Sequence, residues 1–488
     1  MSLKEKTFSA GRWTATSGLV RMALQVVQTA ILARLLVPAD FGSMAIIGAL
    51  LAVVSLFADL GLSRAIIYFP AITRDVLSSL FWLNLGIGFV LTVLFAMLSP
   101  AIAAIYHQTS LTSALVAASP IFVLSAFGQQ FCILAEKDLR FAILARNEML
   151  AAINGFLAAL VLAILGGGIY ALIGGSLLAA VTNSVLAWFT LSQAHRPRFH
   201  LRIGEALPLL RYGGYLVAEN LANTLVRQAD VLVGGAMAST AALGVYSMPR
   251  DLSLRVATVV NPILARVGFP VMARLQGDPV ALRMIYLQTL RMTASANFPA
   301  YVVLGLFAPE IVAILYGPKW HGATIFLRIF AAWGLVRSVG SLVGNLLYAI
   351  GRVRLALGWN LILLVAFFPL LWAGTHIGGL EGLAWTMLGL QLAVFLPSWR
   401  YLVSPACGAR LGEFAGAILP PFIVALVSGV VAWLAVIAID RPFMRLLIGG
   451  CTGLVVYLAL SLRFNRSWTD SMKTLLKWDY PSRTRPTS

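Results

Sequence analysis

The chain has 488 residues, of which 60% are hydrophobic and only 11% are charged, and its formal net charge is +18. Soluble domains carry about 25% charged residues, so this composition excludes a soluble globular protein. The basic residues are scattered between apolar runs instead of being gathered on one polar face, which argues against a nucleic-acid partner.

Apolar runs follow one another along nearly the whole chain, and about 20 apolar residues suffice for a helix to cross a membrane. Read against Gly, Pro and charged breaks, the first half predicts helices at 13–37, 42–68, 77–100, 111–134, 149–165 and 170–191. The second half predicts helices at 212–236, 243–269, 286–315, 324–350, 355–374, 378–401, 414–439 and 442–462. We therefore expect an all-α, polytopic integral membrane protein with about 14 transmembrane helices.

The first break between two apolar runs is the stretch ARLLVPADFG, residues 33–42. Pro38 disfavours helix at the preceding residue, and Asp40 is expected to cap the N-terminus of the next helix. Arg34 lies about one turn before this end and is expected to extend toward the lipid headgroups. The stretch predicts a tight hairpin at the membrane surface.

Lysines and arginines fall almost entirely on one side of this arrangement. With a cytoplasmic N-terminus, the inner segments hold about 25 of them, whereas the outer side holds only Lys319, Arg441 and Arg445. The asymmetry predicts that both termini lie in the cytoplasm.

The two halves resemble each other where they begin. The run from Arg12 and the run from Arg211 both start with Arg and an aromatic residue, continue as a polar-studded helix, and reach a short outer turn followed by glycine. Six helices separate the copies, so two parallel repeats are expected. The predicted organisation is a six-helix bundle over 1–192, a cytoplasmic linker over 193–211, a second six-helix bundle over 212–401, two further helices over 402–465 and a cytoplasmic tail over 466–488.

Ionisable and amide side chains concentrate in the first two helices of each half, where burial in a membrane is expensive. Spacings of three or four residues place many of them on one helix face. The candidates for substrate binding in a hydrophilic cavity between the bundles are Arg21, Gln25, Gln28, Asn223, Arg227, Arg250 and Arg255. The candidates for coupling to an H⁺ or Na⁺ gradient are Asp59, Glu219, Asp230 and Asp251. A simpler alternative for Arg227 and Asp230 is that the two side chains only neutralise each other.

Catalytic and cofactor motifs are absent from the sequence. It contains no G-x-x-x-x-G-K-[ST] loop for nucleotide phosphates, no H-E-x-x-H and no G-x-S-x-G. The three cysteines form no C-x-x-C pair, so no metal site is expected. We therefore expect neither an enzyme nor a resident cofactor.

Two sequence runs carry a family resemblance. ARLLVPADFGSMAI and the run 242–278, which contains Asn-Pro-x-Leu-x-Arg-Val-x-Phe-Pro, resemble the polysaccharide-transporter branch of the multidrug, oligosaccharidyl-lipid and polysaccharide exporter superfamily. The branch comprises Wzx-type flippases, and the similarity is greatest to colanic acid and teichuronic acid exporters. The resemblance implies a protein of the bacterial inner membrane that moves undecaprenyl-diphosphate-linked oligosaccharide from the cytoplasmic to the periplasmic leaflet by alternating access. It also implies membrane lipids and the polysaccharide polymerase or export machinery as further partners.

The sequence alone leaves two other functions open. A small-molecule antiporter of the same superfamily would share the architecture, although a cationic drug calls for an acidic cavity and this chain offers more arginine. A membrane polysaccharide polymerase or glycosyltransferase would be expected to carry a large outer loop with catalytic groups, whereas the outer connections here are short.

Overall fold

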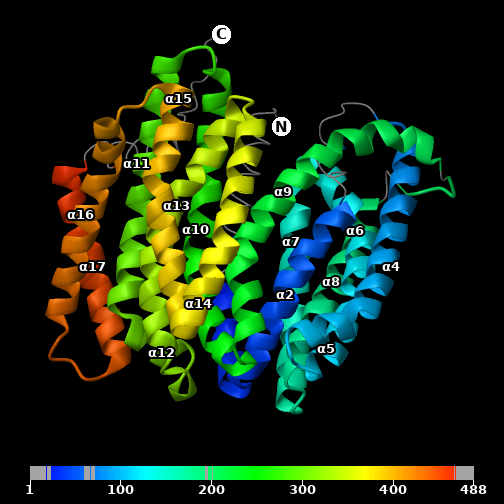
Figure 1. Cartoon of the computed structure of the whole chain (residues 1–488), viewed down its shortest axis with the longest axis horizontal. Helices are drawn as coiled ribbons and strands as arrows, with labels where there is room; N and C mark the ends of the chain where they lie inside the picture. Colours follow the sequence, from blue (N-terminus) through cyan, green and yellow to red (C-terminus); the bar gives the residue numbers. More distant parts are fainter. Residues whose placement is uncertain are drawn as a thin grey trace, which may run out of the picture. The chain divides into compact units, whose positions relative to one another are not determined.

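The computed structural model describes residues 18, 23–59, 66, 72–192, 196–200, 202–465 and 468. All regular secondary structure within these residues is helical, and the chain divides into two compact units (Figure 1). Unit 1 comprises Met1–Met248, Leu315–Trp320 and Ala356–Met387, and unit 2 comprises Pro249–Ile314, His321–Leu355 and Leu388–Ser488. The domain boundaries expected from the sequence stay a prediction.

Unit 1 begins with a short apolar helix, Ala23–Leu35. The helices that follow it are α2 (Pro38–Asp59), α4 (Arg74–Ile105), α5 (Ser110–Ala118), α6 (Ile121–Lys137), α7 (Phe141–Ile164), α8 (Ile169–Leu191) and α9 (Ile203–Met237). The short 3₁₀ turn η2 (Pro318–Trp320) also belongs to this unit. Helix α9 begins within the predicted linker, earlier than the expected residue 212.

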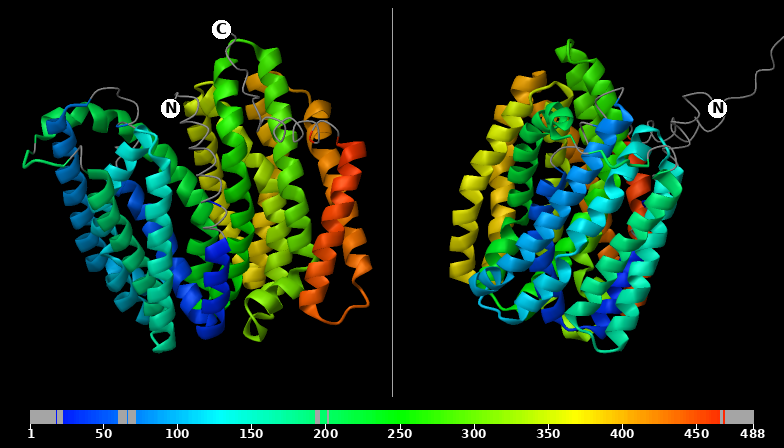
Figure 2. Two further views of the ribbon diagram at one scale, coloured as in Figure 1. Left: turned by 180° about the vertical axis from the view of Figure 1, so that it is seen from behind. Right: turned by 90° about the vertical axis from the view of Figure 1, so that its right-hand side faces the viewer.

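Helix α10 (Thr240–Arg274) starts in unit 1 and continues in unit 2. Unit 2 further contains α11 (Pro279–Leu306), α12 (Ala308–Leu315), α13 (Ala323–Ala349), η3 (Trp399–Val403), α15 (Ser404–Cys407), α16 (Leu411–Ala435) and α17 (Pro442–Phe464). Helix α16 packs against both α11 and α17, and Figure 2 shows α16 and α17 side by side.

Nine helical segments of the described part of the chain are long and apolar enough to cross a membrane, and the bent pair α11–α12 raises this number to ten. One of the nine, 353–407, has 55 residues, far more than the roughly 20 that one crossing needs. It contains α14 (Val353–Ser398), whose backbone is non-helical at Gly378 and Gly379. This break separates two spans where the sequence predicted a turn. The prediction of an all-α, polytopic membrane protein is confirmed.

The outer hairpin after the first helix is tighter than predicted. Helix α2 begins at Pro38, so Asp40 lies in its first turn and is not its N-cap. The Asp40 carboxylate instead accepts a hydrogen bond from the backbone N–H of Val37 at 3.2 Å. Proline starts the helix because its φ is already helical and the N–H it lacks would have no partner there.

Two glycines at corresponding positions of the repeats meet in unit 1. A Cβ built on Gly42 of α2 would overlap the carbonyl oxygen of Thr240, and a Cβ built on Gly244 of α10 would overlap the carbonyl oxygen of Pro38. Only glycine allows the backbones of two helices to approach this closely. The reciprocal contact explains why both copies of the repeat place glycine after the outer turn.

Candidate functional site

Helices α9 and α10 are less apolar than the other long helices. Each has 35 residues, yet neither is among the nine segments apolar enough to cross a membrane. Two carboxylates of α9 are nevertheless buried, because Glu219 is only 1% exposed and Asp230 is 0% exposed. Ionisable groups inside membrane proteins are expensive and mark functional positions, so α9 is where the site begins.

The Glu219 carboxylate accepts a hydrogen bond from a side chain of a sequence-distant helix in the same unit. Asn360 of α14 donates a hydrogen bond from Nδ2 to Oε1 of Glu219 at 3.3 Å. Asn223, one turn along α9, is partly buried. A carboxylate beside amide groups offers oxygen ligands or a proton acceptor in an otherwise apolar bundle.

The Asp230 carboxylate accepts a hydrogen bond from the hydroxyl of Tyr246 at 3.0 Å. Tyr246 lies in the part of α10 that belongs to unit 1 and is itself fully buried. A buried carboxylate needs such partners because desolvation penalises the charge. The bond therefore ties α9 to the start of α10.

Arg227 lies on another face of α9. Its side chain is exposed, whereas Val226 and Ala229 beside it are buried. Arginine offers five donors that match the oxygens of phosphate or carboxylate. Mutual neutralisation of Arg227 and Asp230 stays a prediction.

The first helix contributes two of the predicted amides. Gln25 is exposed and Gln28 is partly buried. The C-terminal part of this helix is held where the Trp320 indole N–H donates to the carbonyl oxygen of Ala33 at 3.0 Å. Arg21, predicted from the same stripe, lies outside the described residues.

The remaining predicted cations belong to the part of α10 in unit 2. Arg250 is 4% exposed, and its Nη1 lies 3.2 Å from Oδ1 of Asp251, whose side chain is 55% exposed. Arg255 is partly buried one turn further along. Arg250 thus has an anionic partner within its own helix, which lowers its availability to a ligand.

The structure brings the predicted residues together only in part. Glu219, Asn223, Arg227 and Asp230 share α9 in unit 1, whereas Arg250, Asp251 and Arg255 belong to unit 2. Asp59 is the last residue of α2, and its side chain lies outside the description. The common cavity between the bundles stays a prediction. In the part of the chain that the structure describes, no three His, Cys, Asp or Glu side chains are grouped to hold a metal ion.

A second polar cluster, absent from the predicted set, surrounds Asn261 in unit 2. Its Nδ2 donates to the Ser338 carbonyl oxygen at 2.9 Å and to the Ser341 hydroxyl at 2.8 Å. Its Oδ1 accepts from Nδ2 of Asn297 at 2.9 Å. Asn261 is the first residue of the Asn-Pro run that carried the family resemblance, so that motif joins α10 to α11 and α13.

Sequence reasoning could have found some of these residues. Asn297 and Asn360 are amides within apolar helices, and such positions are candidates for the reason that Glu219 was one. Tyr246 gave no such signal, because tyrosine is common in membrane helices.

The comparisons with known proteins agree with this architecture. A model of the polysaccharide biosynthesis protein family matches residues 31–325. Lipopolysaccharide biosynthesis protein WzxC of Escherichia coli K12 is 28% identical over 433 residues, which are 89% of this chain and 88% of WzxC. Teichuronic acid biosynthesis protein TuaB of Bacillus subtilis 168 is 25% identical over 466 residues, which are 95% of this chain and 96% of TuaB.

Solved structures share the fold at low sequence identity. The lipid II flippase MurJ in an inward closed conformation superposes with a TM-score of 0.72 at 15% identity, over 92% of this chain and 98% of that one. An inward-facing multidrug resistance MATE family transporter of the MOP superfamily superposes with a TM-score of 0.61 at 15% identity, over 80% of this chain and 98% of that one.

The family model covers more than half of the chain, and these relatives span nearly its whole length. The family resemblance drawn from the two sequence runs is confirmed. The chain is a multi-pass membrane protein that belongs to the polysaccharide biosynthesis protein family.

Proposed function

We propose that this protein carries lipid-linked oligosaccharide repeat units from the cytoplasmic to the periplasmic leaflet of the bacterial inner membrane, for the synthesis of a surface polysaccharide. The observation that carries the proposal is the family match over residues 31–325. The relatives support it because they are named for lipopolysaccharide and teichuronic acid biosynthesis, and one neighbour in fold is named a lipid II flippase.

The chemistry of such a cargo suggests which polar residues of the first helix, α9 and α10 would bind it. Its polyprenyl tail stays in lipid, whereas its diphosphate and sugars must cross a hydrocarbon layer about 30 Å thick. The exposed Arg227 and the partly buried Arg255 are proposed to bind diphosphate oxygens through paired N–H groups. Arg21 and Arg250 are proposed to assist, and at Arg250 the cargo competes with Asp251. The amides of Gln25, Gln28 and Asn223 suit sugar hydroxyls.

Alternating access requires one end of the path to close while the other opens. The glycine contact between α2 and α10 lies at the start of both helices. With both termini in the cytoplasm, this end faces the periplasm. We propose that the close approach at Gly42 and Gly244 belongs to the state whose outer end is closed.

The energy source is proposed to be an H⁺ or Na⁺ gradient. Glu219 and Asp230 are the main candidates because both carboxylates are buried and hydrogen-bonded to partners on other helices. Asp59 and Asp251 remain further candidates. The polymerase or export machinery that consumes the translocated units is the proposed protein partner, and no nucleic acid is involved.

A small-molecule antiporter is the second candidate, because the MATE transporter shares the fold. The arginines of α9 and α10 favour an anionic cargo over a cationic drug. An enzyme of polysaccharide polymerisation is disfavoured by short connections such as 165–168 and 316–322.

The test is a proteoliposome assay with a lipid-linked oligosaccharide whose sugar is labelled. Translocation exposes the label to a membrane-impermeant oxidant, and an organic cation replaces the lipid in a parallel arm. We expect the wild-type protein to move the lipid-linked sugar and Arg227→Ala to be at least about tenfold slower, because charge-assisted bonds to phosphate are lost.

Arg198→Ala is the matched control, since it removes the same charge from an exposed residue of a short surface segment. It should retain wild-type transport. Transport of the organic cation without transport of the lipid-linked sugar would support the antiporter and contradict the flippase.

A further inference from the structure

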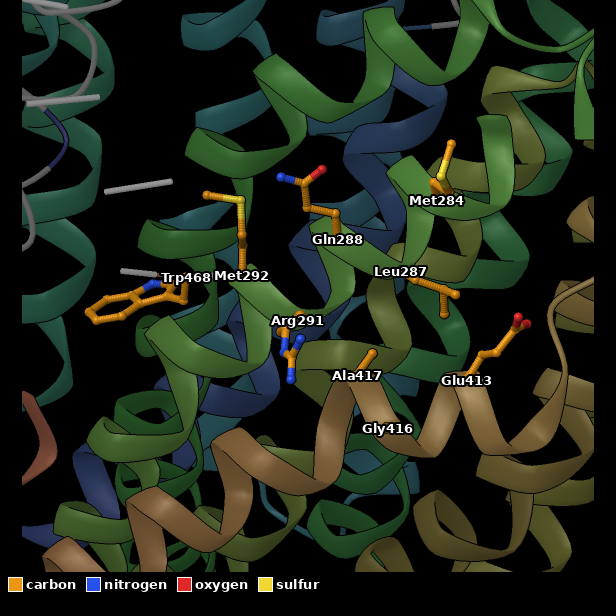
Figure 3. Close-up of a pocket in the computed structure, with 9 residues that line it drawn as sticks. All are labelled: Met284, Leu287, Gln288, Arg291, Met292, Glu413, Gly416, Ala417 and Trp468. Carbon is orange, nitrogen blue, oxygen red and sulfur yellow. The ribbon is translucent and has the colours of Figure 1, made fainter. Parts of the chain in front are cut away.

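A pocket inside unit 2 is lined by none of the residues assigned above. It has a volume of about 330 Å³ and is formed by α11, α16 and Trp468 (Figure 3). Most of its wall is apolar, from Met284, Leu287, Met292, Ala417 and Trp468. Its polar lining comes from Gln288, Arg291 and Glu413.

Arg291 supplies the positive charge that lines this pocket. Its side chain extends from α11 toward α16 (Figure 3), and Nε is buried with no hydrogen-bond partner in the described part of the chain. A guanidinium keeps its proton in proteins and has donors only. A buried, unsatisfied donor of a charged group is costly, so the site calls for an anion.

Glu413 does not fill that role, because other groups engage it. Its Oε2 accepts a hydrogen bond from the backbone N–H of Arg410 at 2.9 Å, and its Oε1 lies 3.7 Å from Nη1 of Arg283. Arg283 therefore offsets the charge of Glu413, and no ion pair compensates Arg291 among the described residues.

The wall that carries Trp468 is firmly attached to α11. Asn465 donates from Nδ2 to the Ser295 hydroxyl at 2.7 Å, and the Tyr457 hydroxyl donates to the Ser295 carbonyl oxygen at 2.6 Å. The Trp468 ring packs edge-on against Tyr457 with centroids 6.0 Å apart. The Trp468 wall of the pocket is therefore anchored to α11.

Next to the pocket, α16 offers an apolar surface. Leu419, Ile423 and Leu426 are 53%, 49% and 42% exposed, and their spacing places them on one helix face. At Gly416 a Cβ would meet nothing within 4 Å, so the backbone there is open. A ligand that has an anionic head and an apolar chain fits this combination.

We propose that this pocket binds the phosphate of an anionic glycerophospholipid, such as phosphatidylglycerol, with an acyl chain along the exposed face of α16. Arg291 donates to the phosphate and Gln288 to the glycerol oxygens. Pockets that bind drug-sized ligands have volumes of about 300–1,000 Å³, so this one takes a small headgroup and not a diphosphate oligosaccharide.

The sequence places this end of the bundle in the cytoplasm, because Arg283, Arg291 and Arg410 are among the inner cations. Anionic lipids of that leaflet attract basic residues at the membrane surface. The lipid would attach α16 and α17 to α11. The inference goes beyond the proposed function, since it concerns a resident lipid and not the cargo.

Native mass spectrometry of the full-length protein in detergent tests the site, with phosphatidylglycerol, phosphatidylethanolamine, undecaprenyl phosphate and inorganic phosphate as separate probes. We expect phosphatidylglycerol to bind most tightly. Arg291→Gln should weaken its binding at least about tenfold, because a charge-assisted hydrogen bond is lost. Gly416→Leu should weaken it as well, because a Cβ at this lining residue meets nothing within 4 Å and the added side chain would take up pocket volume.

Arg463→Gln is the matched control, because it removes one exposed charge at the cytoplasmic end of α17 without lining the pocket. It should bind phosphatidylglycerol like the wild-type protein. Equal binding by Arg291→Gln and the wild type, or equal binding of phosphatidylethanolamine, would overturn the inference. Preferential binding of undecaprenyl phosphate would also overturn it, and so would binding of inorganic phosphate alone. None of these outcomes depends on whether the protein transports a lipid-linked sugar.

Discussion

Helices α9 and α16 differ sharply in what they bury, although both are long. Helix α9 buries Glu219 and Asp230 completely and fails the hydropathy expected of a membrane span. Helix α16 is apolar enough to cross a membrane, and it leaves aliphatic side chains such as Leu419 and Leu434 exposed. Lipid can solvate the surface of α16, whereas α9 is stable only when protein groups surround its carboxylates. We therefore propose that α9 and its neighbours carry the transport function and that α16 and α17 support the bundle.

The largest expected effect comes from the contact between α10 and α2. Gly42→Leu should abolish polysaccharide export, because its side chain would overlap the Thr240 carbonyl and force the two backbones apart. Export by a strain that lacks its own transporter measures the effect, with the protein level in membranes checked in parallel. Gly48→Leu is the control on the same helix, since a Cβ there meets open space. If both variants export normally, the close glycine contact has no role in transport.

A smaller but still strong effect is expected within α9. Asp230→Ala leaves the buried Tyr246 hydroxyl without this acceptor, which should lower stability by about 1–3 kcal/mol and reduce export strongly. Tyr246→Phe removes the same bond and keeps the carboxylate. If the bond only holds the helices together, thermal melting of the two purified variants will fall alike and their export will fall alike. If the charge is needed for coupling, Asp230→Ala will lose more export than its stability explains.

The smallest effect on export is expected at the base of α17. Arg445 forms an ion pair of 2.8 Å with Glu310 of α12, whose side chain is only 6% exposed. Arg445→Gln should lower stability by about 1–3 kcal/mol, because a buried carboxylate loses its partner. Export should stay close to the wild-type level once the protein is folded. Loss of export in a variant that melts like the wild type would contradict the assignment of α17 to the support of the bundle.

The predictable part of this molecule follows from local properties of the chain. The all-helical membrane class could be predicted because an apolar run of sufficient length has few alternatives to a membrane helix. Asp40 shows the limit, since the sequence predicts it as the N-cap of a helix over 42–68, whereas α2 begins at Pro38 and contains Asp40 in its first turn. Both residues are compatible with a helix start, and only the backbone decides between them.

The candidate site was predictable as a set of polar positions but not as a set of partners. Glu219 stood out as a carboxylate in a membrane helix, whereas its partner Asn360 lies 141 residues away. The pocket around Arg291 was not foreseen, because its walls come from three separate stretches of the chain. No spacing rule within one helix links such residues.

The sequence by itself determined that this is a helical membrane protein of the polysaccharide biosynthesis family with charged residues in the helices that begin each repeat. Hydropathy reveals the membrane helices and the resemblance of two sequence runs supplies the family, because both depend only on neighbours along the chain. Only the tertiary structure decided that Gly42 meets Gly244, that Asn360 meets Glu219, and that α11, α16 and Trp468 enclose a pocket. These contacts depend on how helices pack in space, and lipid-exposed and protein-exposed faces become distinct only after that packing is complete.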